Sequence, residues 1–186
     1  MTQRVSYMQN QAYSDSSPTS LGLSRRVLTL LIKLNLLMGF LILALLIATL
    51  VAEGPVMYAL GVRGPGDHSA LFLGMRAIAV IGICAVPLAH IILTRLLSMV
   101  DTVRNGDPFV AVNADRLQTI AWSVFALELM HAVVGIVAAR VSTTSQPLDI
   151  HWSFSVTRWL VVLLLFVLAR VFDQGTRMRE ELEATV

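Results

Sequence analysis

The 23 residues LQTIAWSVFALELMHAVVGIVAA, numbered 117–139, form an apolar run that is long enough to cross a bilayer as one helix. Glu128 and His131 lie near its middle, in the order Glu128-Leu129-Met130-His131. Ionisable residues are rare in hydrocarbon, and they usually face the interior of a helix bundle. We therefore predict a membrane helix over about 115–140 whose polar face points towards other helices.

The energetic balance of this run favours insertion by a small margin. Its ten Leu, Ile, Val and Phe residues contribute roughly −3 to −6 kcal/mol, against about +2.5 to +3.5 kcal/mol for one central charge. On a helical wheel, Ala121, Ala132 and Gly135 share the face of Glu128. Small residues permit close helix approach in membranes, so Glu128 is expected to look into the bundle.

The composition is that of a membrane protein. Hydrophobic residues make up 56% of the chain and charged residues 14%, whereas about a quarter of the residues of a soluble domain are charged. The formal net charge of +2 does not suggest direct binding of nucleic acid. The chain has no Gly-rich phosphate loop, His-Glu-x-x-His or Gly-x-Ser-x-Gly motif, so we do not expect an enzyme.

Taken in order, the chain predicts an all-α, polytopic four-helix membrane bundle. Residues 1–24 are polar and are expected to form a disordered cytosolic tail, followed by a membrane domain over 25–186. The helices are predicted at about 27–52, 71–97, 115–140 and 156–172, the last continuing as a cytosolic amphipathic stub to about 183. With both termini inside, ten Lys and Arg lie on the inner side and four on the outer side, Arg63, Arg76, Arg140 and Arg158. This distribution favours cytosolic termini and a multi-pass membrane protein.

The other helices also present polar faces. Asn35 aligns with Gly39, Ile42, Leu46 and Thr49 on the first helix, and Arg76 shares a face with His90 and Thr94 on the second. If helices two and three form a hairpin, His90 lies roughly 7 Å from the level of Glu128, and Arg76 about 9 Å from that of His131. The intramembrane candidate residues are Glu128, His131, His90, Arg76 and Asn35.

Several interpretations of these residues stay open. A neutral, hydrogen-bonded Glu128 would only fix helix packing, whereas alternating His and Glu would suit a proton or solute relay. Glu128-x-x-His131 with His90 suggests a metal, but a di-iron bundle requires two such repeats. A haem requires two axial His at matched depth, and His90 and His131 are offset by roughly 12 Å. We therefore expect no metal and no cofactor.

Two short motifs resemble a known family. They are Arg104-Asn105-Gly106-Asp107-Pro108-Phe109, followed by Asn113, Arg116 and Leu117, and the C-terminal segment VFDQGTRMREELEATV, residues 171–186. Over roughly Val27 to Val186 the chain is similar to an uncharacterised bacterial family of four-helix inner-membrane proteins, a domain of unknown function. Its members are often encoded beside a small helix-turn-helix regulator, which implies a cytosolic partner. The cytosolic interaction candidates are Gly106, Asp107, Pro108, Phe109, Asp173, Gly175, Arg177 and Arg179.

The leading hypothesis is a sensor or partner subunit that signals to a cytosolic protein through the inner loop and the C-terminal helix. The alternative is a small transporter or channel subunit that uses Glu128, His131 and His90 as a proton or solute relay. In both, the protein lies in a lipid bilayer and is a candidate for homo-oligomerisation.

Overall fold

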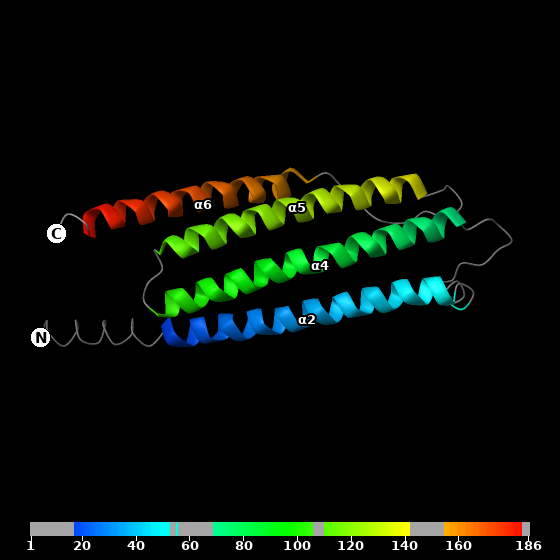
Figure 1. Cartoon of the computed structure of the whole chain (residues 1–186), viewed down its shortest axis with the longest axis horizontal. Helices are drawn as coiled ribbons and strands as arrows, with labels where there is room; N and C mark the ends of the chain where they lie inside the picture. Colours follow the sequence, from blue (N-terminus) through cyan, green and yellow to red (C-terminus); the bar gives the residue numbers. More distant parts are fainter. Residues whose placement is uncertain (1–16, 53–54, 56–68, 106–109, 142–154, 184–186) are drawn as a thin grey trace, which may run out of the picture.

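The computed structural model describes residues 17–52, 55, 69–105, 110–141 and 155–183, and it contains four long helices (Figure 1). These are α2 (Ser17–Val51), α4 (Ser69–Arg104), α5 (Ala111–Val141) and α6 (Val156–Glu183). No strand occurs among the described residues, so the predicted all-α class is confirmed.

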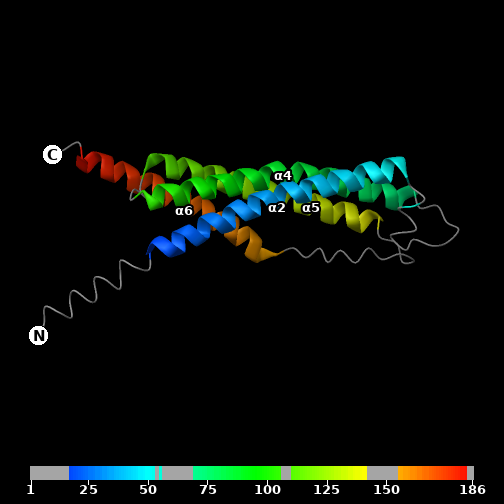
Figure 2. The ribbon, with the colours of Figure 1, turned by 90° about the horizontal axis from the view of Figure 1, so that it is seen from below.

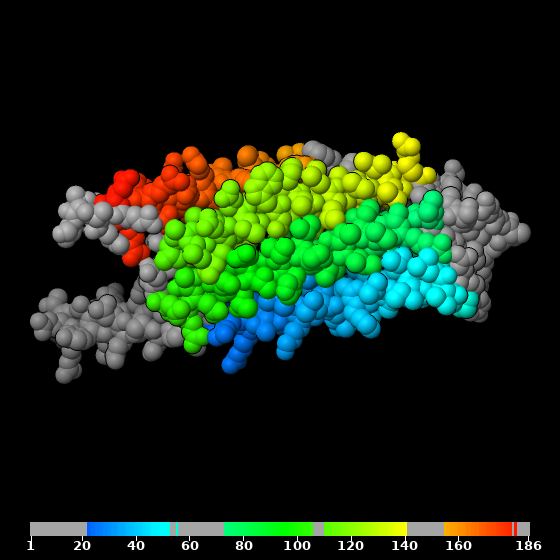
Figure 3. All heavy atoms as spheres, viewed as in Figure 1, coloured from blue at the N-terminus to red at the C-terminus, as the bar shows by residue number. Residues whose placement is uncertain are grey.

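The helices form an open row rather than a closed bundle. Within the described residues, α2 packs on α4, α4 on α5 and α5 on α6, and no other pair of helices is in contact. The space-filling view shows them side by side, with neighbours antiparallel (Figures 1 and 3). The first residues of α2 and the last residues of α6 consequently lie at one end of the row, which we call the basic end because most Lys and Arg gather there.

In the part of the chain that the structure describes, three helices are long and apolar enough to cross a membrane: Gly22–Val51, Leu73–Arg104 and Ala111–Arg140. In the most apolar 18-residue segment of each helix, at most 22% is buried inside the protein. Lipid rather than protein therefore has to cover most of these side chains. The fourth helix, α6, differs because Arg158 and Arg170 bracket only the eleven residues 159–169. Eleven helical residues span about 16 Å, roughly half of the hydrocarbon core.

The first three helices are longer than predicted, whereas α6 has the predicted extent, from 156 to about 183. The first helix begins at Ser17 rather than near 27, so residues 17–24, predicted as disordered tail, are helical. Pro18 falls in the first turn, where a missing N–H costs nothing. The second helix continues past Leu97 to Arg104. Within this extension the Ser98 and Thr102 hydroxyls donate to the carbonyls one turn back, at Thr94 and Ser98, so both hydroxyls are satisfied inside the helix. Residues 1–16 lie outside the described part of the chain.

The polar face predicted on the first helix is its contact with α4. Thr49 is buried and Asn35, Gly39, Ile42 and Leu46 are half-buried, whereas most other side chains from 30 to 50 are exposed. Their spacing of three and four residues is that of one helix seam. At Gly39 a Cβ atom would lie 2.9 Å and 3.1 Å from the two Cγ atoms of Val86, so glycine is required for this approach.

Two glycine substitutions in this seam should have opposite effects. Gly39→Ala should lower the free energy of unfolding by about 1 kcal/mol, because overpacking against the stiff, β-branched Val86 outweighs the better helix propensity of alanine. Gly82→Ala should raise it by up to about 1 kcal/mol, since its Cβ would meet Ile42 at an ordinary 3.6 Å.

Unfolding in mixed detergent micelles, followed by circular dichroism, measures both variants. Adding Val86→Ala should restore part of the free energy of unfolding that Gly39→Ala loses, but it should not raise that of Gly82→Ala. Equal effects of the two glycine substitutions would contradict the close approach at Gly39.

Candidate functional site

Glu128 pairs with an arginine of the last helix. Its carboxylate lies 4.0 Å from Nε of Arg158, and the two side chains are 19% and 35% exposed. Arg158, counted among the outer basic residues from the sequence, is thus a partner of Glu128. The first turn of α6 lies beside the middle of α5 (Figures 1 and 2). Arg158 belongs to this turn and is therefore within reach of Glu128.

Aromatic side chains pack along the same helix pair. The rings of Phe125 and Trp159 are 6.0 Å apart, and those of Trp122 and Phe166 are 5.2 Å apart, both nearly perpendicular. Edge-to-face pairs of this kind contribute about 0.5–1.5 kcal/mol each beyond their buried area. The N-terminal half of α6 is thus held on α5 by two ring pairs and one ion pair.

Arg76 and Asn35 lie instead between α2 and α4. The guanidinium of Arg76 donates to the carbonyl of Thr49 over 2.6 Å, and the amide of Asn35 donates to the carbonyl of Val86 over 3.1 Å. Both side chains cross from one helix to the backbone of the other. Such bonds satisfy polar groups that lipid cannot, and they fix the register of the two helices.

The two histidines do not join Glu128. His90 is half-buried on α4, and its Nδ1 is buried without a hydrogen-bond partner among the described residues. His131 follows Glu128 by one turn of α5, and its side chain is exposed. The predicted polar line is therefore split between two helix interfaces: Arg76 and Asn35 serve the first, and Glu128 serves the last.

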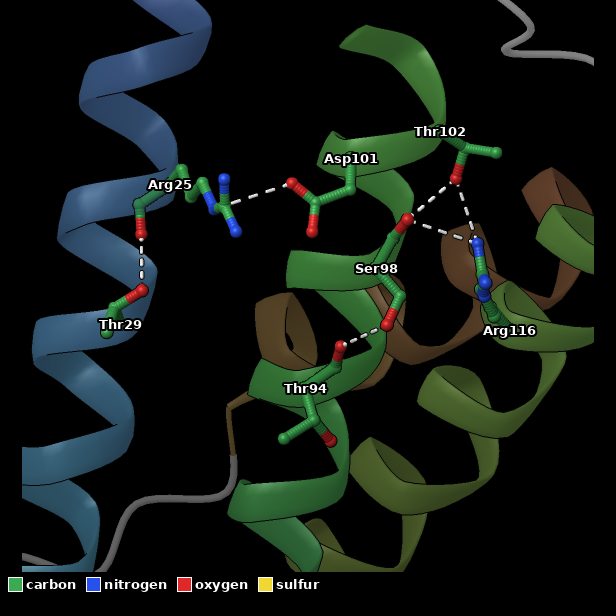
Figure 4. A network of polar contacts seen from close by, with 7 residues as sticks. All are labelled: Arg25, Thr29, Thr94, Ser98, Asp101, Thr102 and Arg116. Atoms are coloured by element: carbon green, nitrogen blue, oxygen red, sulfur yellow. Dashed lines mark hydrogen bonds and ion pairs between the residues drawn. The ribbon is translucent and has the colours of Figure 1, made fainter. Parts of the chain in front are cut away.

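A polar network that the sequence interpretation did not single out lies at the basic end (Figure 4). Nη1 of Arg116 donates to the carbonyl of Ser98 at 3.1 Å and to the Thr102 hydroxyl and Asn113 Oδ1 at 2.9 Å. Asn113 is only 1% exposed. Arg25 of α2 adds an ion pair with Asp101 of α4 at 3.6 Å. We call these contacts the inner network; they connect α2, α4 and α5. Of its members, Asn113 and Arg116 had been noted in the sequence as part of the family-like motif.

A cleft of about 450 Å³ opens between α5 and α6 at the basic end. Two of the cytosolic interaction candidates, Asp173 and Arg177, line it and form an ion pair of 3.4 Å. The cleft residues are Ala114, Asp115, Gln118, Phe166, Ala169, Arg170, Asp173 and Arg177.

The structure gives less information on the remaining cytosolic interaction candidates. Gly175 lies in α6, and a Cβ built there would meet nothing within 4 Å, so packing does not explain this glycine. Arg179 is exposed near the C-terminal end of α6. Gly106, Asp107, Pro108 and Phe109 fall outside the described residues. Within the described ranges, no group of three His, Cys, Asp or Glu side chains could hold a metal ion.

The ion pair between Glu128 and Arg158 should be energetically coupled. Glu128→Gln and Arg158→Gln should each lower the free energy of unfolding by about 1–3 kcal/mol, below the cost of breaking a fully buried pair because both side chains are partly exposed. The double variant should lose less than the sum of the two. Unfolding in mixed micelles gives the double-mutant cycle, and strictly additive losses would contradict the contact.

Comparison with known proteins gives one match. Residues 65–186 match the family described as Protein of unknown function (DUF2975), so the match starts later than the resemblance over 27–186 had implied and leaves α2 outside it. No curated protein and no solved structure matches the chain. Because the match covers about two thirds of the chain, this helical protein with three membrane-length helices belongs to that family of unknown function.

Proposed function

We propose that this protein is a non-enzymatic sensor or partner subunit of the bacterial inner membrane, and that α6 carries its signal to a cytosolic protein. The observation that carries the proposal is the cleft between α5 and α6, because it joins two predicted interaction residues, Asp173 and Arg177, at the basic end. A small helix-turn-helix regulator is the proposed partner.

The packing of α6 supports an output role. Among the described residues the two outer helices have one neighbour each, α2 packing on α4 and α6 on α5, while α4 and α5 have neighbours on both sides. Of the two outer helices, α6 has the shorter apolar segment. An element with one neighbour can shift without disturbing the others, and elements that move are drawn from the less stable parts of a protein. A signal that alters the contact of Glu128 with Arg158 would therefore act on α6 first.

The charge distribution supports a cytosolic location of the cleft. Nine described Lys and Arg residues lie towards the basic end, whereas Arg76 and Arg140 lie towards the other end. The excess of basic residues marks the cytosolic side of membrane proteins. Both termini are accordingly proposed to be cytosolic.

The cleft has the chemistry of a protein contact rather than of a closed ligand pocket. Asp173 lies between Arg170 at 4.0 Å and Arg177 at 3.4 Å, and both arginine side chains are more than two thirds exposed. Phe166 and Ala169 supply an apolar part of the lining. A charged rim beside an apolar centre is the usual composition of a protein interface.

The relay alternative receives less support from the geometry. Glu128 pairs with an arginine of α6, and Arg76 donates to the backbone of α2, so the two side chains make these contacts in separate helix interfaces. His131 is exposed.

Charge reversal in the cleft tests the proposal. Arg177→Glu should lower the recovery of the cytosolic partner on the tagged full-length protein at least tenfold, because it places a third carboxylate beside Asp115 and Asp173. Quantitative mass spectrometry after mild detergent extraction measures the recovery. Arg140→Glu, a matched reversal at the opposite end of the row, should leave it unchanged. Equal recovery from Arg177→Glu and the unaltered protein would remove the proposed role of α6.

The topology can be tested separately with single cysteines. In a Cys84→Ser background, a cysteine at Arg179 should react with a membrane-impermeant maleimide only after the inner membrane is opened. A cysteine at Arg140 should react in intact spheroplasts. The reverse pattern would contradict cytosolic termini.

A further inference from the structure

We propose that the N-terminal part of α2 binds the phosphate headgroup of an anionic phospholipid in a cleft lined by Arg25, Arg26, Thr29, Leu30 and Lys33. This cleft of about 300 Å³ lies at the basic end and is separate from the one between α5 and α6. The inference does not depend on the identity of any cytosolic partner.

The cleft faces the surroundings of the protein rather than α4. At about 100° per residue, Arg26, Leu30 and Lys33 lie some 140–200° around α2 from Leu28 and the seam that packs on α4. All three side chains are exposed. A bilayer lipid beside the protein can therefore reach them without displacing a helix.

The cleft carries an excess of positive charge. Among the described residues, Arg25 is the one of its three cations that has a carboxylate close by, the partly exposed Asp101 at 3.6 Å. Arg26 and Lys33 have no ion pair or hydrogen bond within the described part of the chain. Arg26 and Lys33 lie on the same face of α2, about two helical turns from each other. Two cations in this arrangement are suited to binding a phosphate, and the Thr29 hydroxyl adds a polar group to the same lining.

The surface next to the cleft favours a lipid over a free phosphate. Leu30, Leu34, Leu37 and Leu41 follow one another along the same side of α2, each between 49% and 66% exposed. Their spacing of four, three and four residues makes a continuous apolar ridge that starts in the cleft and runs towards the middle of the helix. A headgroup in the cleft would thus place its acyl chains along the leucine ridge.

The test compares two double variants that remove the same charge. Purified full-length protein is titrated with phosphatidylglycerol or phosphatidylcholine, and lipid adducts are counted by native mass spectrometry. Arg26→Gln with Lys33→Gln should weaken phosphatidylglycerol binding about 25-fold, since each cation near an anionic lipid contributes about fivefold. Arg95→Gln with Arg104→Gln, two exposed cations of α4 outside the cleft, should weaken it less than threefold.

Three further measurements decide the outcome. The charge-conserving Arg26→Lys with Lys33→Arg should retain binding, and circular dichroism should show unchanged helicity in every variant. Inorganic phosphate at 10 mM should not displace the lipid. Equal weakening by both double Gln variants would indicate diffuse attraction and overturn the cleft, as would equal binding of phosphatidylcholine. Displacement by inorganic phosphate would overturn the lipid assignment and leave a simple anion site.

Discussion

Polar groups on a helix that lipid surrounds have to be satisfied within the protein, and this requirement shapes every interface of the row. Asn35 and Arg76 reach the backbone across the interface of α2 and α4. Arg116 reaches Ser98 across that of α4 and α5, and Arg158 meets Glu128 across that of α5 and α6. Apolar contacts alone provide little association in hydrocarbon, because lipid tails are as apolar as leucine. Each of these three helix pairs therefore carries a polar contact across its interface that lipid could not supply.

Much of the fold could be predicted from the sequence because it depends on periodicity. The face of Asn35, Gly39 and Thr49 was found by helical spacing alone, and the structure confirms it as the seam with α4. The number and order of the helices followed from the long apolar runs. What spacing cannot provide is the choice of neighbours: a closed bundle would have brought Arg76, His131 and Glu128 together, whereas an open row sends Arg76 and Glu128 to different interfaces.

Arg158, the partner of Glu128, is a second example of a contact that helical spacing cannot predict. Arg158 lies at the start of an apolar run, where an interfacial position is the ordinary expectation. It reaches Glu128 because α6 begins beside the middle of α5, a displacement that depends on how two surfaces fit and not on the pattern of either helix (Figure 2). The inner network was missed for a related reason. In the sequence, the polar residues Ser98, Asp101 and Thr102 resemble an ordinary helix end. Their partners, Arg25 and Arg116, belong to the neighbouring helices and are close to them only in the folded protein.

These contacts divide the described helices into a three-helix unit, α2, α4 and α5, and a separate helix, α6. The inner network ties α2, α4 and α5 together at the basic end, and the same three helices are long and apolar enough to span a membrane. The fourth, α6, has a shorter apolar segment and one neighbouring helix, and its ion pairs from Arg170 and Arg177 to Asp173 are made within the helix. Within the described residues, the inner network thus joins the three membrane-length helices, whereas α6 is joined to them through α5 alone.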